Sequence, residues 1–126
     1  MPDFAHLHVH SEFSLLDGAC RVGKLLDAVQ AAGMSACAVT DHGAMYGVVD
    51  FYQKAIERGI HPVIGCEVYT CADRFEKQSA AREYNHLILL CENQTGYHNL
   101  MQLVSAGFTE GFYYKPRIDM KLLRKH

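Results

Sequence analysis

The sequence lacks the features of membrane, exported and disulfide-stabilised proteins. Its longest apolar runs, such as residues 87–91, are far shorter than the roughly 18 residues that a membrane-spanning helix needs. The N-terminus has no basic stretch followed by an apolar one, so we expect a cytoplasmic protein without membrane contact. The five cysteines are odd in number and show no CxxC spacing, which predicts reduced, buried thiols.

A glycine-rich phosphate loop is also lacking. The Asp17-Gly18 pair and the glycines of residues 43–47 fit neither the Walker nor the dinucleotide pattern, which argues against a nucleotide-binding domain of either kind. The composition, with 49% hydrophobic and 21% charged residues, is that of one packed globular domain. Net charge is −2, although residues 113–126 hold five Lys or Arg and one Asp, so the rest of the chain is more acidic. An acidic body that handles phosphate needs cations, and the eight histidines make bound metal ions a reasonable hypothesis.

Alternating strand and helix patterns predict an α/β fold. Strands are expected at residues 4–10, 36–40, 62–69 and 86–91. Apolar residues at helical spacing predict helices near residues 22–29, 48–56 and 97–108, with Gly33 and Gly59 ending the first two. Asp119 is placed to cap a further helix, and the polar residues 72–83 are expected to form an exposed excursion. This alternation favours parallel β-α units, and about four strands fit an incomplete barrel.

Two histidines two residues apart are the first candidate metal ligands. In the predicted first strand His8 and His10 share a face with His6, while Leu7 and Val9 point to the other face. Two imidazoles on one strand edge can chelate one ion, and catalytic groups of parallel β/α folds gather where strands end.

Similar side chains follow the later strands. Asp41 and His42 come directly after the second strand, and Glu67 closes the third. Asp17, in the loop after the first strand, is either a ligand or a turn former before glycine. Asp41 either binds metal or orients His42. His86 precedes its strand, so the residue pattern leaves it open as a ligand or a strand-start residue.

Cysteine ligation is a further alternative. Cys66 and Cys71 flank Glu67 and could bind zinc, although isolated thiols in apolar sequence are usually core residues.

Seven segments carry a family resemblance: FAHLHVHS at 4–11, SLLDG at 14–18, TDH at 40–42, GCEVY at 65–69, NHLILL at 85–90, TGYHNL at 95–100 and GFYYKPRID at 111–119. Together they resemble the N-terminal PHP (polymerase and histidinol phosphatase) domain of the bacterial DNA polymerase III alpha-subunit family. The resemblance implies a distorted (β/α)7 barrel with a trinuclear metal centre, of which residues 1–126 are the N-terminal half. Residues 113–126 would be a basic segment that leads to the rest.

The resemblance also implies the roles of six residues. His8 and His10 would bind one ion, Glu67 would bridge it to a second ion held by His86, and Asp17 and His42 would bind the third. The ions would be zinc, with manganese or iron as alternatives. Further ligands would come from motifs beyond His126, so we expect residues 1–126 alone to bind metal weakly and to hydrolyse little.

The implied activity is metal-assisted phosphoester hydrolysis, as in a 3′–5′ exonuclease of a replicative polymerase, with the DNA primer 3′ end and other replisome subunits as partners. A stand-alone phosphatase of the histidinol-phosphate type and a non-catalytic, metal-stabilised module remain alternatives. An incomplete barrel exposes a sheet edge, so residues 1–126 are expected to be marginally stable and to self-associate. The basic segment offers DNA contacts through Tyr113, Tyr114, Lys115 and Arg117, or is a solvated linker and amphipathic helix.

Overall fold

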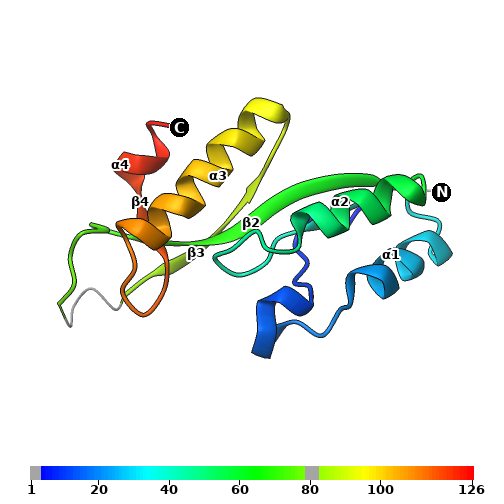
Figure 1. Cartoon of the computed structure of the whole chain (residues 1–126), viewed down its shortest axis with the longest axis horizontal. Coiled ribbons are helices and arrows are strands. Elements are labelled where there is room, and N and C mark those ends of the chain that lie inside the picture. The colour runs from blue at the N-terminus through cyan, green and yellow to red at the C-terminus, as the bar shows by residue number, and fades with distance from the viewer. Residues whose placement is uncertain (1–3, 79–82) are drawn as a thin grey trace.

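One long strand organises the structure, which is a computed structural model describing residues 4–78 and 83–126. Strand β2 (His61–Cys71) pairs with every other strand in this part of the chain. Strand β1 (Ala36–Val39) lies parallel to its first half, β3 (Asn85–Leu90) antiparallel to its second half, and β4 (Arg117–Asp119) parallel to its last residues. The sheet is therefore mixed, and both its parallel pairs use β2 (Figure 1).

The helices follow the sequence pattern. Helix α1 (Val22–Ala31) and α2 (Val48–Glu57) end as predicted, because Gly33 and Gly59 adopt positive φ angles of 71° and 67° just beyond them. Helix α3 (Gln94–Thr109) begins at Asn93, whose side chain accepts a hydrogen bond from the backbone N–H of Gly96. A short 3₁₀ helix, η1 (Glu12–Asp17), precedes α1.

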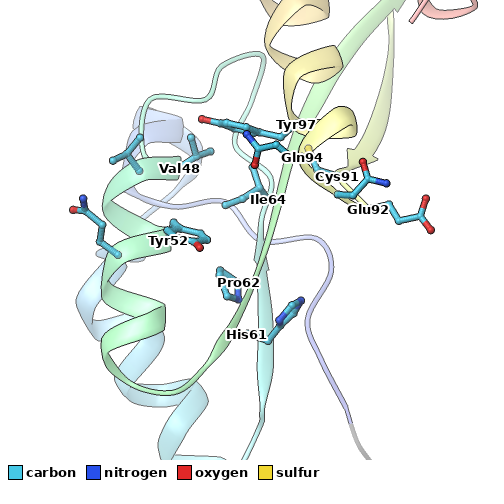
Figure 2. A pocket seen from close by; sticks show the side chains of 12 residues that line it. Val48, Tyr52, His61, Pro62, Ile64, Cys91, Glu92, Gln94 and Tyr97 are labelled. Atoms are coloured by element: carbon cyan, nitrogen blue, oxygen red, sulfur yellow. The ribbon is translucent and has the colours of Figure 1, made fainter.

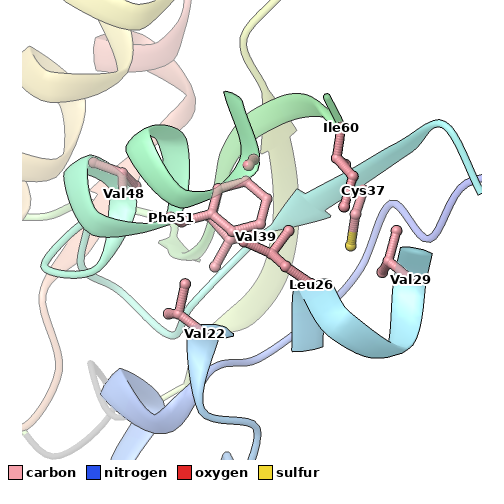
Figure 3. Packing of buried hydrophobic residues seen from close by; sticks show 9 residues of the cluster. Val22, Leu26, Val29, Cys37, Val39, Val48, Phe51 and Ile60 are labelled. Atoms are coloured by element: carbon pink, nitrogen blue, oxygen red, sulfur yellow. The ribbon is translucent and has the colours of Figure 1, made fainter. Parts of the chain in front are cut away.

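Two apolar clusters hold the helices to the sheet, α1 and α2 beside one end of β2 and α3 and α4 (Met120–Leu123) beside the other (Figure 1). Figure 3 shows the first, in which Leu26, Val39 and Phe51 are fully buried between α1, β1 and α2. In the second, Leu100 and Ile118 pack α3 against β4. No helix of residues 4–78 or 83–126 is long and apolar enough to cross a membrane.

The direction of one strand differs from the prediction. We expected parallel β-α units throughout, but β3 runs antiparallel to β2. The reason is the connection between them: residues 72–83 supply no crossover helix within the described part, and a parallel return requires such a crossover. Residues 79–82 of that predicted excursion lie outside the described residues.

The first predicted strand is also irregular. Residues 4–10 run beside β1 through one isolated bridge, between His6 and Cys37, with additional backbone hydrogen bonds from Ala38 to His6 and from Thr40 to Val9. The segment is extended, as expected, but its ladder is too short to count as a strand.

The basic C-terminal segment is neither a solvated linker nor an exposed DNA-contact surface throughout. Arg117 is fully buried, and its guanidinium donates to the backbone oxygens of Gly111, Arg74 and Glu76. The proposed phosphate contact by Arg117 is therefore wrong. The predicted cap by Asp119 is confirmed, since its side chain accepts from the N–H of Leu122 at the start of α4.

The cysteines are only partly buried as a group. Cys37 and Cys66 are buried and Cys71 and Cys91 intermediate, whereas Cys20 is exposed, contrary to the prediction. Burial raises the pKa of the Cys66 thiol to about 12, with the nearby Asp41 carboxylate adding to the effect. Such a thiol stays protonated at neutral pH.

Candidate metal centre

Glu67 is the centre of a cluster of histidines. It lies on β2, only 3% exposed, and its carboxylate Oε2 is 2.7 Å from Nε2 of His8 and 2.5 Å from Nε2 of His10. The two imidazole Nε2 atoms are themselves 3.0 Å apart. The extended first segment beside β1 thus brings both histidines to Glu67, in the part of β2 that lies beyond its pairing with β1.

Two of the other three candidate residues lie beside the same carboxylate, and the third lies against the histidines. Nδ1 of His86 lies 2.5 Å from Oε1 of Glu67, and Nδ1 of His42 lies 3.8 Å from its Oε2. Asp17, at the end of η1, places its Oδ2 2.5 Å from Nε2 of His42 and 3.8 Å from Nδ1 of His10. All six predicted residues therefore meet at one place.

The direction of β3 explains why His86 reaches the cluster. Because β3 is antiparallel to β2, its first residues pair with the last residues of β2, and His86 lies opposite Tyr69. Tyr69 shares a face with Glu67, two residues away. A histidine that starts an antiparallel strand therefore lies at the same end of the sheet as one that ends a parallel strand. The residue pattern alone does not show the direction of the strand, so it could not decide whether His86 reaches the cluster.

The ligand atoms form three overlapping groups of three, in which all donors lie within 4.8 Å of one another. The groups are His8, His10 and Glu67; His10, Asp17 and His42; and His42, Glu67 and His86. Two nitrogens at 2.0–2.1 Å from a tetrahedral zinc ion would be about 3.3 Å apart, which is close to the separation between His8 and His10. The donor set and its spacing therefore fit divalent metal ions.

His42 supplies a second indication. Its Nδ1 atom is buried and has no hydrogen-bond partner among the described residues. A buried ring nitrogen without a partner is costly unless water or an ion satisfies it. His42 Nδ1 lies 3.8 Å from Oε2 of Glu67, and His42, Glu67 and His86 form one of the three groups. A cation bound between these three side chains would remove that cost.

Electrostatics also favour an anionic Glu67. Burial raises the pKa of its carboxyl group, but hydrogen bonds with His8 and His10, together with the charges of His42 and His10, outweigh this and lower the pKa below its usual value. The carboxylate is thus available as a ligand at neutral pH.

The remaining candidates lie outside these groups. Among the described residues, His6, Asp41, Cys66 and Cys71 belong to none of them. Asp41 is buried and does not contact the His42 ring; its carboxylate accepts from Ser11 and Ser14. The sequence pattern alone does not indicate this role of Ser11 and Ser14, because the pairing with Asp41 joins segments about 30 residues apart.

Aromatic rings line the cluster on the β3 side. Tyr69, which is buried, stacks near His42 with ring centroids 6.2 Å apart, and Tyr84 stacks near His86 at 5.8 Å. The Nζ atom of Lys115 lies 5.4 Å from the centroid of the Tyr69 ring. These contacts restrict the orientation of both imidazoles, and the sequence pattern had not indicated them.

A separate groove of about 510 Å³ lies between α2 and the start of α3 (Figure 2). Its lining includes Tyr52, Pro62, Ile64 and Tyr97, and none of the six clustered residues contributes to it. The groove and the candidate metal centre are therefore different places on the molecule.

Comparison with known sequences points to one family. The protein family described as "PHP domain" matches residues 6–126 of this chain. DNA polymerase III subunit alpha of Chlamydia pneumoniae is 49% identical over 123 residues, covering 95% of this chain and 10% of that protein. The corresponding proteins of Treponema pallidum and Thermus aquaticus are each 47% identical, over 126 and 129 residues, covering 98% of this chain and 11% of theirs. The chain spans about a tenth of the length of these curated relatives.

Two solved structures have a similar fold. An amidohydrolase from Chromobacterium violaceum, with bound sulfate and no metal, superposes with a TM-score of 0.56 at 25% identity, over 81% of this chain and 34% of that one. A protein from Bifidobacterium adolescentis described as a metal-dependent phosphoesterase superposes with a TM-score of 0.55 at 18% identity, over 85% and 35%. Both matches cover only part of the larger protein, which agrees with the expected partial barrel.

Proposed function

Because the chain belongs to the PHP family, we propose that it carries the N-terminal part of a metal-dependent phosphoesterase centre in the alpha subunit of a replicative DNA polymerase. The observation that carries the proposal is the convergence of four histidines on the buried carboxylate of Glu67, with Asp17 against two of them. The relatives named above are DNA polymerase III alpha subunits, of which this chain covers 10–11%.

Each residue has a definite task in this proposal. His8, His10 and Glu67 would hold one ion, His86 with Glu67 would hold a second, and Asp17 with His42 would hold a third. Zinc suits these imidazole and carboxylate donors, with manganese or iron as alternatives. When bound, the ions supply positive charge to the phosphate and lower the pKa of the attacking water.

The exposure of the ligands is consistent with catalysis. The side chains of His8, His86 and Asp17 are 56%, 46% and 70% exposed, so a substrate phosphate can approach, whereas Glu67 stays buried beneath them. A purely structural zinc site is normally closed by four protein ligands. Each group here offers three, which supports open coordination positions for substrate or for ligands outside residues 1–126.

The substrate class we favour is the 3′ end of DNA, since the relatives at 47–49% identity are DNA polymerase III alpha subunits. The alternative is a small phosphate monoester. The sulfate in the amidohydrolase with a similar fold is a tetrahedral anion like phosphate, and it favours neither substrate over the other.

The test uses the longest natural polypeptide that contains residues 1–126, loaded with zinc or manganese. We expect it to shorten 5′-labelled single-stranded DNA from the 3′ end, and His10→Ala to lower the rate at least 100-fold because one ion loses its ligand. His98→Ala is the matched control, since His98 is an exposed histidine on α3 that pairs with Gln94.

Three results would contradict the proposal. Cleavage of p-nitrophenyl phosphate without cleavage of DNA would indicate a small-molecule phosphatase. A lower melting temperature in His10→Ala with no hydrolysis in the parent would indicate a structural metal site. Equal activity of His10→Ala and His98→Ala would place the chemistry elsewhere.

A further inference from the structure

Two buried residues directly before His42 each bind a different ligand-bearing segment. Thr40 is fully buried, and its Oγ1 accepts a hydrogen bond from the backbone N–H of Val9 at 2.9 Å and donates to the carbonyl oxygen of Val9 at 3.2 Å. Val9 stands between His8 and His10. Thr40 therefore fixes the backbone from which both histidines project.

Asp41, the next residue, binds the loop on the other side of His10. It is 3% exposed, and its Oδ1 accepts from the backbone N–H of Ser11 and from the hydroxyl of Ser14, both at 2.6 Å. Its Oδ2 accepts from the hydroxyl of Ser11 at 2.7 Å. The Ser14 hydroxyl in turn accepts from the backbone N–H of His42 at 3.2 Å. The Asp41 carboxylate is therefore linked through Ser14 of η1 to the backbone of His42.

Helix η1, which carries Asp17 and is called the Asp17 loop below, depends strongly on the Asp41 carboxylate. Residues 4–10, which carry His8 and His10, depend on it less. Residues 4–10 have backbone hydrogen bonds to β1 and to the residue after it, from Ala38 N–H to the carbonyl oxygen of His6 and from Thr40 N–H to that of Val9. Inside η1, by contrast, Leu15 has non-helical angles of φ 45° and ψ −108°, and Leu15 and Leu16 are largely exposed. Few apolar contacts therefore hold the loop, and buried hydrogen bonds to a charged acceptor are among the stronger ones.

We propose that Thr40 and Asp41 are positioning residues that set the affinities of two different ions: Thr40 for the ion assigned to His8, His10 and Glu67, and Asp41 for the ion assigned to Asp17 and His42. This inference rests on the proposed metal centre and deepens it. Neither residue supplies a ligand atom. Of three consecutive residues, Thr40 thus holds the segment with His8 and His10, Asp41 holds the loop with Asp17, and His42 would bind metal.

The test measures zinc affinities in zinc-buffered solution with the longest natural polypeptide that contains residues 1–126. Thr40→Val removes the hydroxyl at nearly constant shape, and Asp41→Ala removes the carboxylate. Loss of a residue that orients a ligand weakens metal binding about 10- to 100-fold. We expect Asp41→Ala to weaken the ion that is lost in Asp17→Asn, and Thr40→Val to weaken the ion that is lost in His8→Ala.

Anomalous scattering at the zinc edge identifies the ion that each variant loses. Asp41→Asn should restore part of the affinity, because its remaining oxygen can still accept from Ser11 and Ser14. Ser14→Ala, which leaves the carboxylate in place, should affect the same ion as Asp41→Ala. These two variants keep the test decisive if Asp41→Ala does not fold.

The outcomes separate this inference from the proposed function. If the unsubstituted protein binds no zinc at the six residues, both are overturned. If it binds zinc and both variants weaken every ion equally while lowering the melting temperature of the metal-free protein, the residues only stabilise the fold and the inference alone fails. Unchanged affinities in both variants overturn it as well.

Discussion

Gly18→Ala tests how tightly the Asp17 loop is built. A Cβ atom at position 18 would lie 1.9 Å from the backbone oxygen of Ser11 and 3.1 Å from the Cβ of Ser14. Ordinary contacts begin near 3.4 Å, so the backbone must open by at least about 1 Å. The φ of Gly18 is −128°, which alanine adopts freely, so the whole effect is steric.

Such a shift is large for a metal ligand. Ligand distances in metal sites vary by about 0.2 Å, and residue 17 is adjacent to the displaced position. We expect Gly18→Ala to weaken binding of the ion assigned to Asp17 and His42 at least about 10-fold in zinc-buffered titrations. The overpacking should also cost about 1–3 kcal/mol, or a melting temperature about 4–12 °C lower in differential scanning calorimetry.

Gly23→Ala is the matched control. Gly23 lies within α1, and its nearest foreign atom is an Arg58 side-chain nitrogen at 4.0 Å. The substitution should leave metal affinity unchanged and stabilise the protein by about 0.5–1 kcal/mol. If Gly18→Ala retained all ions at wild-type affinity, the account of the loop would be refuted.

Other substitutions test the burial and charges that the structure assigns. Arg117→Met should destabilise the fold by about 3 kcal/mol or more in urea unfolding, because the fully buried guanidinium that donates to three backbone carbonyl oxygens is removed; an effect below about 1 kcal/mol would contradict its burial. Burial raises the pKa of Asp119, but hydrogen bonds from two backbone N–H groups and the ion pair with Arg74 lower it more, so the net shift is downward. Its charged form therefore stabilises the fold above the ordinary aspartate pKa of about 3.9, and this stabilisation is lost as the pH falls through the lower pKa of the folded state. Asp119→Asn should accordingly cost about 2 kcal/mol at pH 7 and progressively less below pH 4, and a difference independent of pH would refute the assignment. Iodoacetamide followed by mass spectrometry should label the exposed Cys20 within minutes and leave Cys66 unmodified in the folded protein, since its thiol has a pKa of about 12; rapid labelling of Cys66 would show that it is accessible.

Local signals in the sequence were sufficient for the helices and for most candidate ligands. Gly33 and Gly59 end their helices because only glycine adopts positive φ without strain, and this requirement is readable from one residue. Likewise, the strand period placed His8 and His10 on one face. The prediction that Glu67 closes its strand was wrong, because β2 continues beyond Glu67 to Cys71.

Long-range pairing was not readable in the same way. The apolar pattern of β3 is the same whether the strand runs parallel or antiparallel to β2. The position of His86 therefore depends on the path of the connection between β2 and β3, whose sequence shows no helical or strand periodicity. Arg117 was assigned to the surface because charge usually indicates exposure. Its acceptors are carbonyl groups of residues 74, 76 and 111, which only the folded chain brings together.

The most direct measurement of the central claim is anomalous diffraction at the zinc edge from crystals of the longest natural polypeptide that contains residues 1–126. The account predicts ions about 2.0–2.2 Å from imidazole nitrogens and carboxylate oxygens of the clustered residues, with Glu67 in contact with at least one ion. The residues are His8, His10, Asp17, His42, Glu67 and His86. Zinc-loaded crystals without anomalous density at these atoms, or with density only elsewhere, would contradict it.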